Sequence, residues 1–473
     1  MKLRTSILLG CAALFTATSC TTTPAKKSWS EQVIENARAQ IGLEIDTIEA
    51  SGKCLNPVTL NSKGGVYYCG PADWRSGFFP GSVWYLYELT GDQTLLPLAQ
   101  KYTEAISEAQ YLTWHHDIGF IINCSFGNGL RLTADPSYKD VMVQAAKSLS
   151  TRFREAPQVI QSWNVDKGWQ SERGWECPVI IDNMMNLELL FEATKLSGDS
   201  TFYNVAVAHA DRTLQEHFRP DGSCYHVIDY SIEDGTVRHR QTAQGYADES
   251  AWARGQAWAI YGYTVCFRET KDRKYLDQAL KTFEFMKNHK NMPADLVPYW
   301  DLDAPNIPNE PRDASSASVI ASALYEICTY PVENPQSYKE YADIASYPLS
   351  ESVFVVALPP NQQRAVCSLL PQRLFVYPSR REHETGVRGQ LRMLCLLPQC
   401  AGFVAPDGGR RLAGGACNGC LSHLFPFGGG HTLRHVSAPD VALRAESKET
   451  HPFLRRAGMG RAAGAVALGT RDL

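Results

Sequence analysis

Five pairs of helical segments recur along the chain, and this repetition restricts the fold more than any other feature. In each pair an apolar stretch runs into a short polar turn with Gly, Asp or Asn, and a second amphipathic stretch follows. The turns lie near residues 90–94, 133–137, 197–201, 270–274 and 329–337. Residues of this kind end one helix and cap the next, so each unit predicts a helical hairpin. A hairpin cannot bury its apolar face alone, and the five must therefore stack together.

The spacing of the hairpins is irregular, roughly 40 to 70 residues, which argues against an open solenoid of strict repeats. It favours an all-α closed toroid with long loops at one end, and long loops on a rigid scaffold are where functional sites form. All ten tryptophans precede residue 301, and several lie in these loops. There they either stack against sugar rings or fill the core, and both interpretations stay open.

The first residues have the pattern of an export signal. Lys2 and Arg4 precede an apolar run at 6–15 that is too short to span a bilayer comfortably. Residues 17–20 (Ala-Thr-Ser-Cys) resemble a loose bacterial lipoprotein cleavage site, with Cys20 as the acylated N-terminus of the mature protein. The alternative is simple secretion with cleavage nearby.

The chain has 14 cysteines, and the seven from Cys54 to Cys328 are scattered singly, without the paired spacing that is typical of a zinc site. A body of this size can fold without disulfides even where export permits them. We expect mostly buried free thiols, with one possible bridge between Cys54 and Cys69. Cys417 and Cys420 form an isolated CxxC that lacks a second pair.

The stretch Trp114–Phe120 (WHHDIGF) combines titratable and stacking side chains, as in a site for a sugar or another flat polar ligand. The alternative is a polar loop whose histidines cap a helix. Because His115, His116 and Asp117 are adjacent, we expect their side chains to diverge rather than to converge on one metal ion. No HExxH, calcium loop, phosphate-binding glycine loop or nucleophile motif is visible, so neither a metal nor a cofactor is predicted.

A second carboxylate, Asp182, lies in the otherwise apolar run 178–185, which begins the first helix of the third hairpin. At the loop end of the toroid, a partly desolvated carboxyl can have a raised pKa and can serve as both acid and base. The alternative is an ordinary helix-capping aspartate.

A third cluster spans Gln244–Trp258 and joins polar groups to tryptophans. Arg254 offers a planar pair of donors that suits a carboxylate or sugar hydroxyls. The alternative interpretation is that Arg254 only forms a salt bridge on its helix. Nearby, His226 alternates with apolar residues as in a short strand, where a lone histidine is usually structural.

The net charge of −4 conceals a strong asymmetry along the chain. Residues 353–473 hold 15 basic and 7 acidic residues, whereas residues 1–352 hold 31 basic and 43 acidic residues. An acidic body of this kind is a poor candidate for nonspecific nucleic-acid binding, and an anionic ligand would need local donors.

Five motifs, taken together and in this order, resemble the unsaturated glucuronyl hydrolases of glycoside hydrolase family 88. They are WRSGFFPG (74–81), WHHDIGF (114–120), IDNMMN (181–186), WARGQAW (252–258) and DASSAS (313–318). The resemblance covers about residues 30 to 345. It implies an (α/α)6 barrel, in agreement with the hairpins, and it implies no metal or cofactor.

The same resemblance implies an activity on unsaturated uronic-acid oligosaccharides. Family enzymes remove the 4,5-unsaturated uronic acid that polysaccharide lyases leave at the non-reducing end of glycosaminoglycan fragments. Water adds across the C4=C5 bond, and the resulting hemiketal collapses and releases the next sugar. This differs from ordinary two-carboxylate glycoside hydrolysis.

By the family's motifs, Asp182 both protonates C4 and activates the water, and Asp117 holds the ring hydroxyls. The expected substrate contacts are Trp74, His116, His226, Gln244, Trp252, Arg254 and Trp258.

From about Tyr347 onward the chain no longer resembles the family. The Lys:Arg ratio changes from 16:15 before residue 353 to 1:14 after it, and tryptophan vanishes. This change indicates translation in another reading frame. We therefore expect a signal peptide at 1–20, a tether at 21–28, a barrel at 29–347 that is incomplete at its C-terminal end, and a poorly ordered tail at 348–473.

Two other functions stay open. One is the related unsaturated rhamnogalacturonyl hydrolase, which acts on pectin fragments with the same barrel and hydration chemistry. The other is a noncatalytic glycan-binding lipoprotein, against which the presence of both Asp117 and Asp182 argues. In each case we expect export to the periplasm or outer membrane of a Gram-negative bacterium, with membrane contact only through a lipid anchor. The sequence does not determine the linkage preference or the oligomeric state.

Overall fold

The computed structural model describes residues 27–60 and 66–352, which belong to one compact unit. Cys20, the tail from residue 353 and the expected incomplete end of the barrel lie outside the described residues. The last described helix, α13, continues to Ser352, past the predicted domain boundary.

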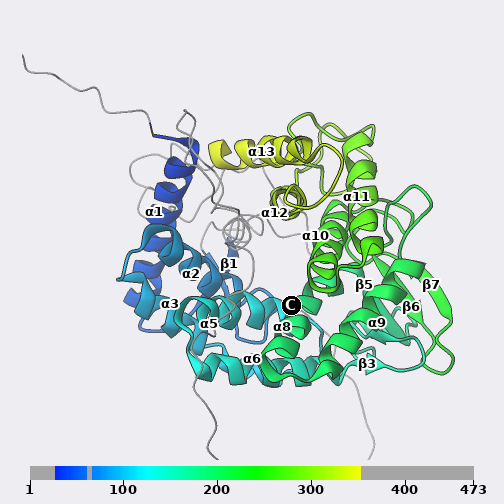
Figure 1. The fold of residues 1–473 in the computed structure, drawn as a ribbon, viewed down its shortest axis with the longest axis horizontal. Helices are drawn as coiled ribbons and strands as arrows, with labels where there is room; N and C mark the ends of the chain where they lie inside the picture. Colours follow the sequence, from blue (N-terminus) through cyan, green and yellow to red (C-terminus); the bar gives the residue numbers. More distant parts are fainter. Residues whose placement is uncertain (1–26, 61–65, 353–473) are drawn as a thin grey trace, which may run out of the picture. The chain divides into compact units, whose positions relative to one another are not determined.

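The five predicted hairpins are confirmed as antiparallel neighbours along the chain. They are α2 (Phe78–Thr90) with α3 (Leu95–Glu104), α5 (Asn128–Thr133) with α6 (Pro136–Ser150), α8 (Leu187–Ser197) with α9 (Ser200–Glu216), α10 (Ala253–Thr270) with α11 (Arg273–Asn288), and α12 (Ala314–Ile327) with α13 (Pro335–Ser352). An additional helix, α1 (Trp29–Ala50), packs against α2. Within this unit the helices follow one another around a ring, from α1 through α8 and α10 to α12 (Figure 1). The predicted all-α toroid is therefore correct.

The hairpin turns form for local reasons that the sequence displays. Gly91 and Gly198 end their helices in the left-handed conformation, which a residue without Cβ adopts at little cost. Asp135, Asp199 and Asp272 then accept a backbone N–H two residues on and so cap the second helix of their hairpins.

Burial divides the helices into an inner and an outer set. Every residue from Ala253 to Phe267 of α10 is buried, and so is every residue from Ala314 to Leu324 of α12. The outer helix α11 buries only one face, with Tyr275, Ala279 and Phe283 among its buried residues. A helix that is buried on all sides belongs to the inner wall of such a ring.

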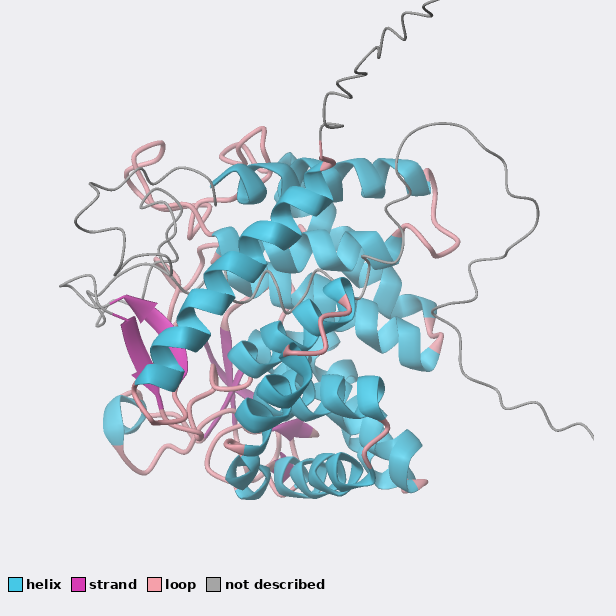
Figure 2. Ribbon diagram, turned by 90° about the vertical axis from the view of Figure 1, so that its left-hand side faces the viewer, coloured by secondary structure: helices cyan, strands magenta, loops and turns pink. Residues whose placement is uncertain are grey.

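Short elements in the connecting loops were not predicted, apart from a strand near His226. The helical ones are η1 (Ser107–Tyr111), α4 (Ile118–Ile122), η2 (Asn123–Gly127), α7 (Gly168–Ser171) and η3 (Ile181–Asn186). The strands form three antiparallel sheets: β1 (Asn56–Leu60) with β2 (Val66–Cys69), β3 (Phe153–Arg154) with β4 (Val159–Ile160), and β5 (Cys177–Ile180) with β6 (Val227–Tyr230) and β7 (Val237–Gln241). Figure 2 shows how short these strands (magenta) are beside the helices (cyan).

All seven cysteines between Cys54 and Cys328 are free thiols, so the predicted Cys54–Cys69 bridge is wrong. In the β1–β2 hairpin the residue opposite Cys69 is Asn56, whereas Cys54 lies exposed in the loop before β1. Of these seven thiols, Cys177, Cys224 and Cys266 are buried, three are partly exposed and Cys54 is exposed, so the expectation that most would be buried is wrong. No helix among the described residues is long and apolar enough to cross a membrane.

Candidate active site

Asp117 lies at the loop end of the ring, immediately before α4, with a histidine on each side of its carboxylate. Its two oxygens lie 3.5 Å from His115 Nδ1 and 3.4 Å from His116 Nε2. The expectation that these three side chains diverge is therefore wrong. The two histidines differ in what they offer the carboxylate. His115 Nδ1 accepts the Asp117 backbone N–H at 3.0 Å and its Nε2 lies 3.0 Å from the Ala72 carbonyl, so the His115 nitrogen near the carboxylate carries no proton.

Both histidines are neutral at physiological pH. Burial lowers the pKa of His116 to about 3 and also lowers the pKa of His115. The Nδ1 atom of His116 lies 3.5 Å from the amide nitrogen of Asn186 and 3.3 Å from Ser162 Oγ, both able to donate. Its proton is therefore assigned to Nε2, the atom that faces Asp117.

The second predicted carboxylate, Asp182, lies in η3 and is only 8% exposed. It is not a helix cap, because the residue that precedes α8 is Asn186. Strand β5 pairs with β6, and the Ile181 amide then donates to the His226 carbonyl at 3.0 Å. This pairing places His226 Nε2 at 3.8 Å from Asp182 Oδ2.

His226 has a defined tautomer. Its Nδ1 accepts hydrogen bonds from the backbone amides of Ala243 at 3.0 Å and Gln244 at 3.1 Å. The imidazole proton is therefore on Nε2, facing Asp182. Burial and the nearby Arg254 charge lower the pKa of His226 well below its ordinary value, so the imidazole next to Asp182 is neutral. His116 and His226 thus present the same group to the two site carboxylates.

Asn186 connects the two halves of the site. Its side-chain carbonyl accepts the Phe120 amide at 3.0 Å, and its amide group approaches His116. The approach is close because Gly119 faces it: a Cβ on Gly119 would lie 2.6 Å from Asn186 Cα. Neither residue was predicted as a site residue, although both lie inside the motifs that drew attention to Asp117 and Asp182.

The predicted residues Gln244, Trp252 and Arg254 are brought together around His226. The Arg254 guanidinium donates to Asp313 at 2.9 Å and to Gln244 at 3.0 Å, and its Cζ lies 4.8 Å from the centroid of the Trp252 ring. The Trp252 ring in turn lies 4.4 Å from the His226 ring. Arg254 is therefore a salt-bridged helix arginine, the alternative given above, and it also borders the predicted site.

The predicted tryptophans differ in how much of each ring a ligand could reach. Trp252 and Trp258 are 2% and 1% exposed, so both rings mainly fill the core. Trp74 is half-buried and meets Phe120 edge-on at 5.9 Å, and Phe120 meets Trp258 at 5.3 Å.

A further aromatic group lies beside the site and was not among the predicted site residues. Trp163 contacts Trp169 at 5.1 Å and stacks on Trp175 at 5.9 Å. Trp169 is 38% exposed, and Trp114, which packs on His115, is 50% exposed. These rings are open surfaces on which a sugar could stack.

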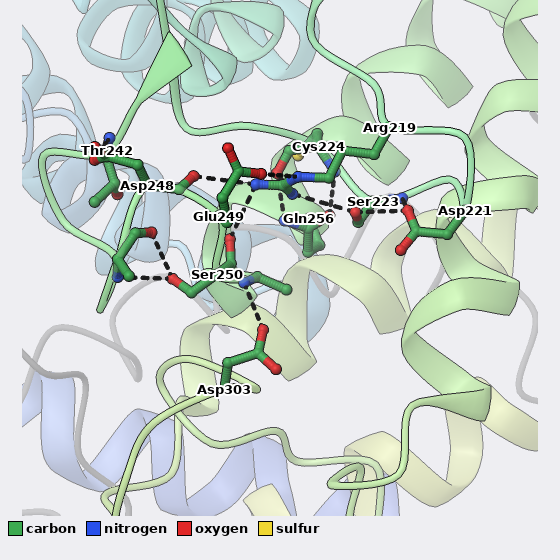
Figure 3. A network of polar contacts seen from close by, with 12 residues as sticks. Arg219, Asp221, Ser223, Cys224, Thr242, Asp248, Glu249, Ser250, Gln256 and Asp303 are labelled. Atoms are coloured by element: carbon green, nitrogen blue, oxygen red, sulfur yellow. Dashed lines mark hydrogen bonds and ion pairs between the residues drawn. The ribbon is translucent and has the colours of Figure 1, made fainter.

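A polar network fastens the loop that meets His226 (Figure 3). The Arg219 guanidinium donates to the carbonyls of Asp248 and Cys224, both at 3.1 Å. Gln256 of α10 exchanges two hydrogen bonds with the Cys224 backbone, at 2.8 and 3.0 Å. The segment before His226 is therefore anchored to the inner helix through Gln256, and loop 242–250 is joined to that segment through Arg219, a role that the sequence did not reveal.

The described part of the chain contains no group of three or more His, Cys, Asp or Glu residues placed to hold a metal ion. The described residues of the site offer two carboxyl groups, each next to a neutral imidazole, and are bordered by aromatic rings.

Comparisons with known proteins agree on one family. Residues 66–345 match the family described as Glycosyl Hydrolase Family 88. An unsaturated glucuronyl hydrolase of Formosa agariphila is 49% identical over 272 residues, which are 57% of this chain and 66% of that protein. An unsaturated chondroitin disaccharide hydrolase of Streptococcus agalactiae is 32% identical over 63% of this chain and 73% of its own length.

Solved structures show the same relation. A crystal structure of an unsaturated glucuronyl hydrolase specific for heparin is 40% identical, with a TM-score of 0.65 over 71% of this chain and 88% of that one. The unsaturated glucuronyl hydrolase of Bacillus sp. GL1, responsible for the degradation of glycosaminoglycan, is 26% identical, with a TM-score of 0.67 over 79% and 97% of the two chains.

Proposed function

The chain belongs to glycosyl hydrolase family 88, with the all-α (α/α)6 barrel fold, and on this premise we propose its reaction. The protein removes 4,5-unsaturated glucuronic acid from the non-reducing end of lyase-generated glycosaminoglycan oligosaccharides. The observation that supports this most is the pairing of Asp182 with His226 on η3, the segment whose Asn186 bonds α4 beside Asp117. One relative is described as specific for heparin and another as a chondroitin disaccharide hydrolase, and both descriptions favour a glycosaminoglycan substrate.

In the proposed reaction, Asp182 acts first as an acid and then as a base. Its proton goes to C4 of the unsaturated ring, and the carboxylate then takes a proton from the water whose oxygen bonds to C5. The hemiketal that forms at C5 collapses and releases the next sugar. The Nε2–H of His226 faces Asp182 and stabilises its ionised form between the two proton transfers.

Asp117 has a different role in this proposal. Its carboxylate accepts hydrogen bonds from the ring hydroxyls and so orients the sugar against Asp182. The Nε2 atom of His116 lies 3.4 Å from Asp117, and in this proposal its proton favours the ionised carboxylate. The half-buried Trp74 and Trp163 and the more exposed Trp169 supply stacking surfaces for the sugars.

The test is the substitution Asp182→Asn in the full chain. With an unsaturated disaccharide from a chondroitin, hyaluronan or heparin lyase, loss of the C4=C5 absorbance should slow by at least about 10³-fold. Asp199→Asn is the matched control, since asparagine caps a helix as well as aspartate does. Near-normal turnover by folded Asp182→Asn would sink the assignment.

The same assay separates the alternatives. Turnover of pectin-lyase products in preference to the glycosaminoglycan products would identify the rhamnogalacturonyl specificity. Binding of an unsaturated disaccharide without turnover by the unmodified chain would identify a noncatalytic binding protein.

We also propose export with lipidation at Cys20. The support is the sequence pattern alone, because residues 1–26 lie outside the described structure. A Cys20→Ala variant should lose incorporation of labelled palmitate and should no longer fractionate with membranes. Palmitate labelling that persists in this variant would contradict the proposal.

A further inference from the structure

Arg152 is a buried arginine beside the candidate active site, in the link between α6 and β3. Its side chain is 2% exposed. The Nε atom donates to the Gln161 carbonyl at 2.6 Å, and Nη1 donates to the Thr113 carbonyl at 2.6 Å and to Asn164 Oδ1 at 3.0 Å. The remaining nitrogen, Nη2, is buried and has no hydrogen-bond partner among the described residues.

The positive charge of Arg152 has no carboxylate within 4.0 Å in the part of the chain that the structure describes. This distinguishes it from Arg254, whose charge is paired with Asp313 at 2.9 Å. Burial lowers the pKa of Arg152 to about 10, so the guanidinium stays charged at neutral pH. A buried charge without an opposite charge beside it costs folding free energy. Titratable groups whose pKa is strongly shifted cluster at functional sites.

The bonds of Arg152 end on the two segments that carry the Asp117 turn. Thr113 precedes His115 on one strand of the bridge and Asn164 follows Trp163 on the other, and one guanidinium nitrogen bonds both. A planar group with several fixed donors suits this task, which a lysine ammonium would fulfil less well.

The titratable groups around Arg152 come from several elements. Asp117, Cys177 and Arg154 all act on its charge. In turn, the Arg152 charge adds to burial in lowering the pKa of His115 and His116.

We propose that Arg152 is a positioning residue for Asp117. It holds the turn from Thr113 to Asp117 against Ser162–Asn164. Its positive charge adds to burial in disfavouring protonation of the two imidazoles and favours the ionised form of Asp117. This inference rests on the proposed function for its kinetic consequence, but its effect on the histidines exists without any substrate.

The test compares Arg152→Met and Arg152→Lys with Arg154→Met as the control. Arg154 lies on the same hairpin and bonds Gln161 Oε1 at 2.9 Å, but its guanidinium reaches the surface. In Arg152→Met the acidic limb of the kcat/KM profile should move to higher pH by about one unit, because lost positive charge favours protonation. Arg152→Lys should keep that limb and raise KM several-fold, and Arg154→Met should change neither.

A titration of the histidine Cε1–H resonances by NMR checks the same effect without turnover. His115 and His116 should protonate at higher pH in Arg152→Met than in the unmodified chain. An unchanged acidic limb and unchanged titrations in folded Arg152→Met would overturn the proposal. If Arg152→Met does not fold, the test rests on Arg152→Lys, which keeps the positive charge. A shift of the acidic limb of its kcat/KM profile would contradict the proposed role of that charge. If the unmodified chain shows no turnover, the proposed function fails. The NMR titration of His115 and His116 then remains as the test of the role of Arg152.

Discussion

At the scale of single residues, the site depends on which nitrogen of each histidine carries the proton. In His226 the two backbone donors at Nδ1 leave Nε2 as the protonated atom, 3.8 Å from Asp182. In His116 the donors Asn186 and Ser162 have the same effect, and Nε2 faces Asp117. A histidine whose tautomer is set in this way acts as a fixed donor and does not need to titrate.

Two substitutions of His226 separate its two sides. Asparagine places an acceptor near the Nδ1 position, and glutamine places an amide donor near the Nε2 position. We expect His226→Asn to lose about 10²-fold or more in kcat, as for removal of one donor that faces the reacting group. His226→Gln should retain more activity than His226→Asn.

Initial rates with an unsaturated disaccharide, at saturating and at low concentration, give this comparison. Circular dichroism melts of both variants show whether the fold is intact. Equal activity of the two variants would mean that the Nε2–H of His226 does not act on Asp182.

At the scale of elements, the site is a contact between two short helical segments, α4 and η3, that are far apart in the chain. The Gly119 position makes the contact possible, and the Asn186 side chain spans it. Similar close approaches occur where Gly262 of α10 faces Met184 of η3, with 2.4 Å from a Cβ built there to Met184 Cβ. η3 is therefore packed closely against Gly119 of α4 and Gly262 of α10. This packing on two sides holds the segment that carries Asp182 in place.

Substitution of Gly119 tests this packing. In Gly119→Ala the added methyl would lie 2.6 Å from both Asn186 Cα and Oδ1, so α4 and η3 must separate. We expect a loss of about 1–3 kcal/mol in the free energy of unfolding and more than tenfold lower kcat/KM.

Gly42→Ala is the matched control, because it lies within α1 and has nothing within 4 Å of a built Cβ. It should be neutral or stabilising by about 0.5–1 kcal/mol. Urea denaturation and initial rates measure both variants, and normal activity of Gly119→Ala would show that the contact tolerates movement.

At the scale of the whole molecule, buried neutral histidines couple folding to pH. His116, His209, His217 and His226 are fully buried or nearly so. Burial lowers the pKa of His116 and His217 to about 3, and lowers the pKa of His209 and His226 well below the ordinary value. The unfolded chain binds these protons near pH 6.5, so their contribution to stability is complete above that pH and is lost as pH falls toward about 3.

We therefore expect the urea midpoint to fall markedly between about pH 7.5 and about pH 5. Each histidine can contribute up to about 1.4 kcal/mol per pH unit once the unfolded chain is protonated. Buried carboxyls act with the opposite sign, since burial raises the pKa of Glu188, Asp229 and Asp301. The histidines should dominate because their shifts are larger.

The control is His239→Gln, because His239 is exposed on β7. This variant should show the same loss of stability with acid as the unmodified chain. A urea midpoint that is level over this range would contradict the prediction.

The sequence by itself determined the ring of helical hairpins and the motifs from which the site is made. Hairpins follow from caps and apolar periodicity within about ten residues, such as Asp199 followed by its amphipathic helix, and these local preferences survive in the folded chain. The sequence also indicated Asp117, Asp182 and His226 as members of one site, although only through a family resemblance.

Only the tertiary structure decided how those residues meet. Three features depend on the packing of segments distant in sequence: the position of His116 and Asp117 beside η3, the hydrogen bond that Asn186 accepts from α4, and the separation of Cys54 from Cys69. Arg152 is the clearest case, because nothing near it in the chain distinguishes it from a surface arginine. Distances between side chains from different elements are set by how those elements pack, and no local pattern specifies them.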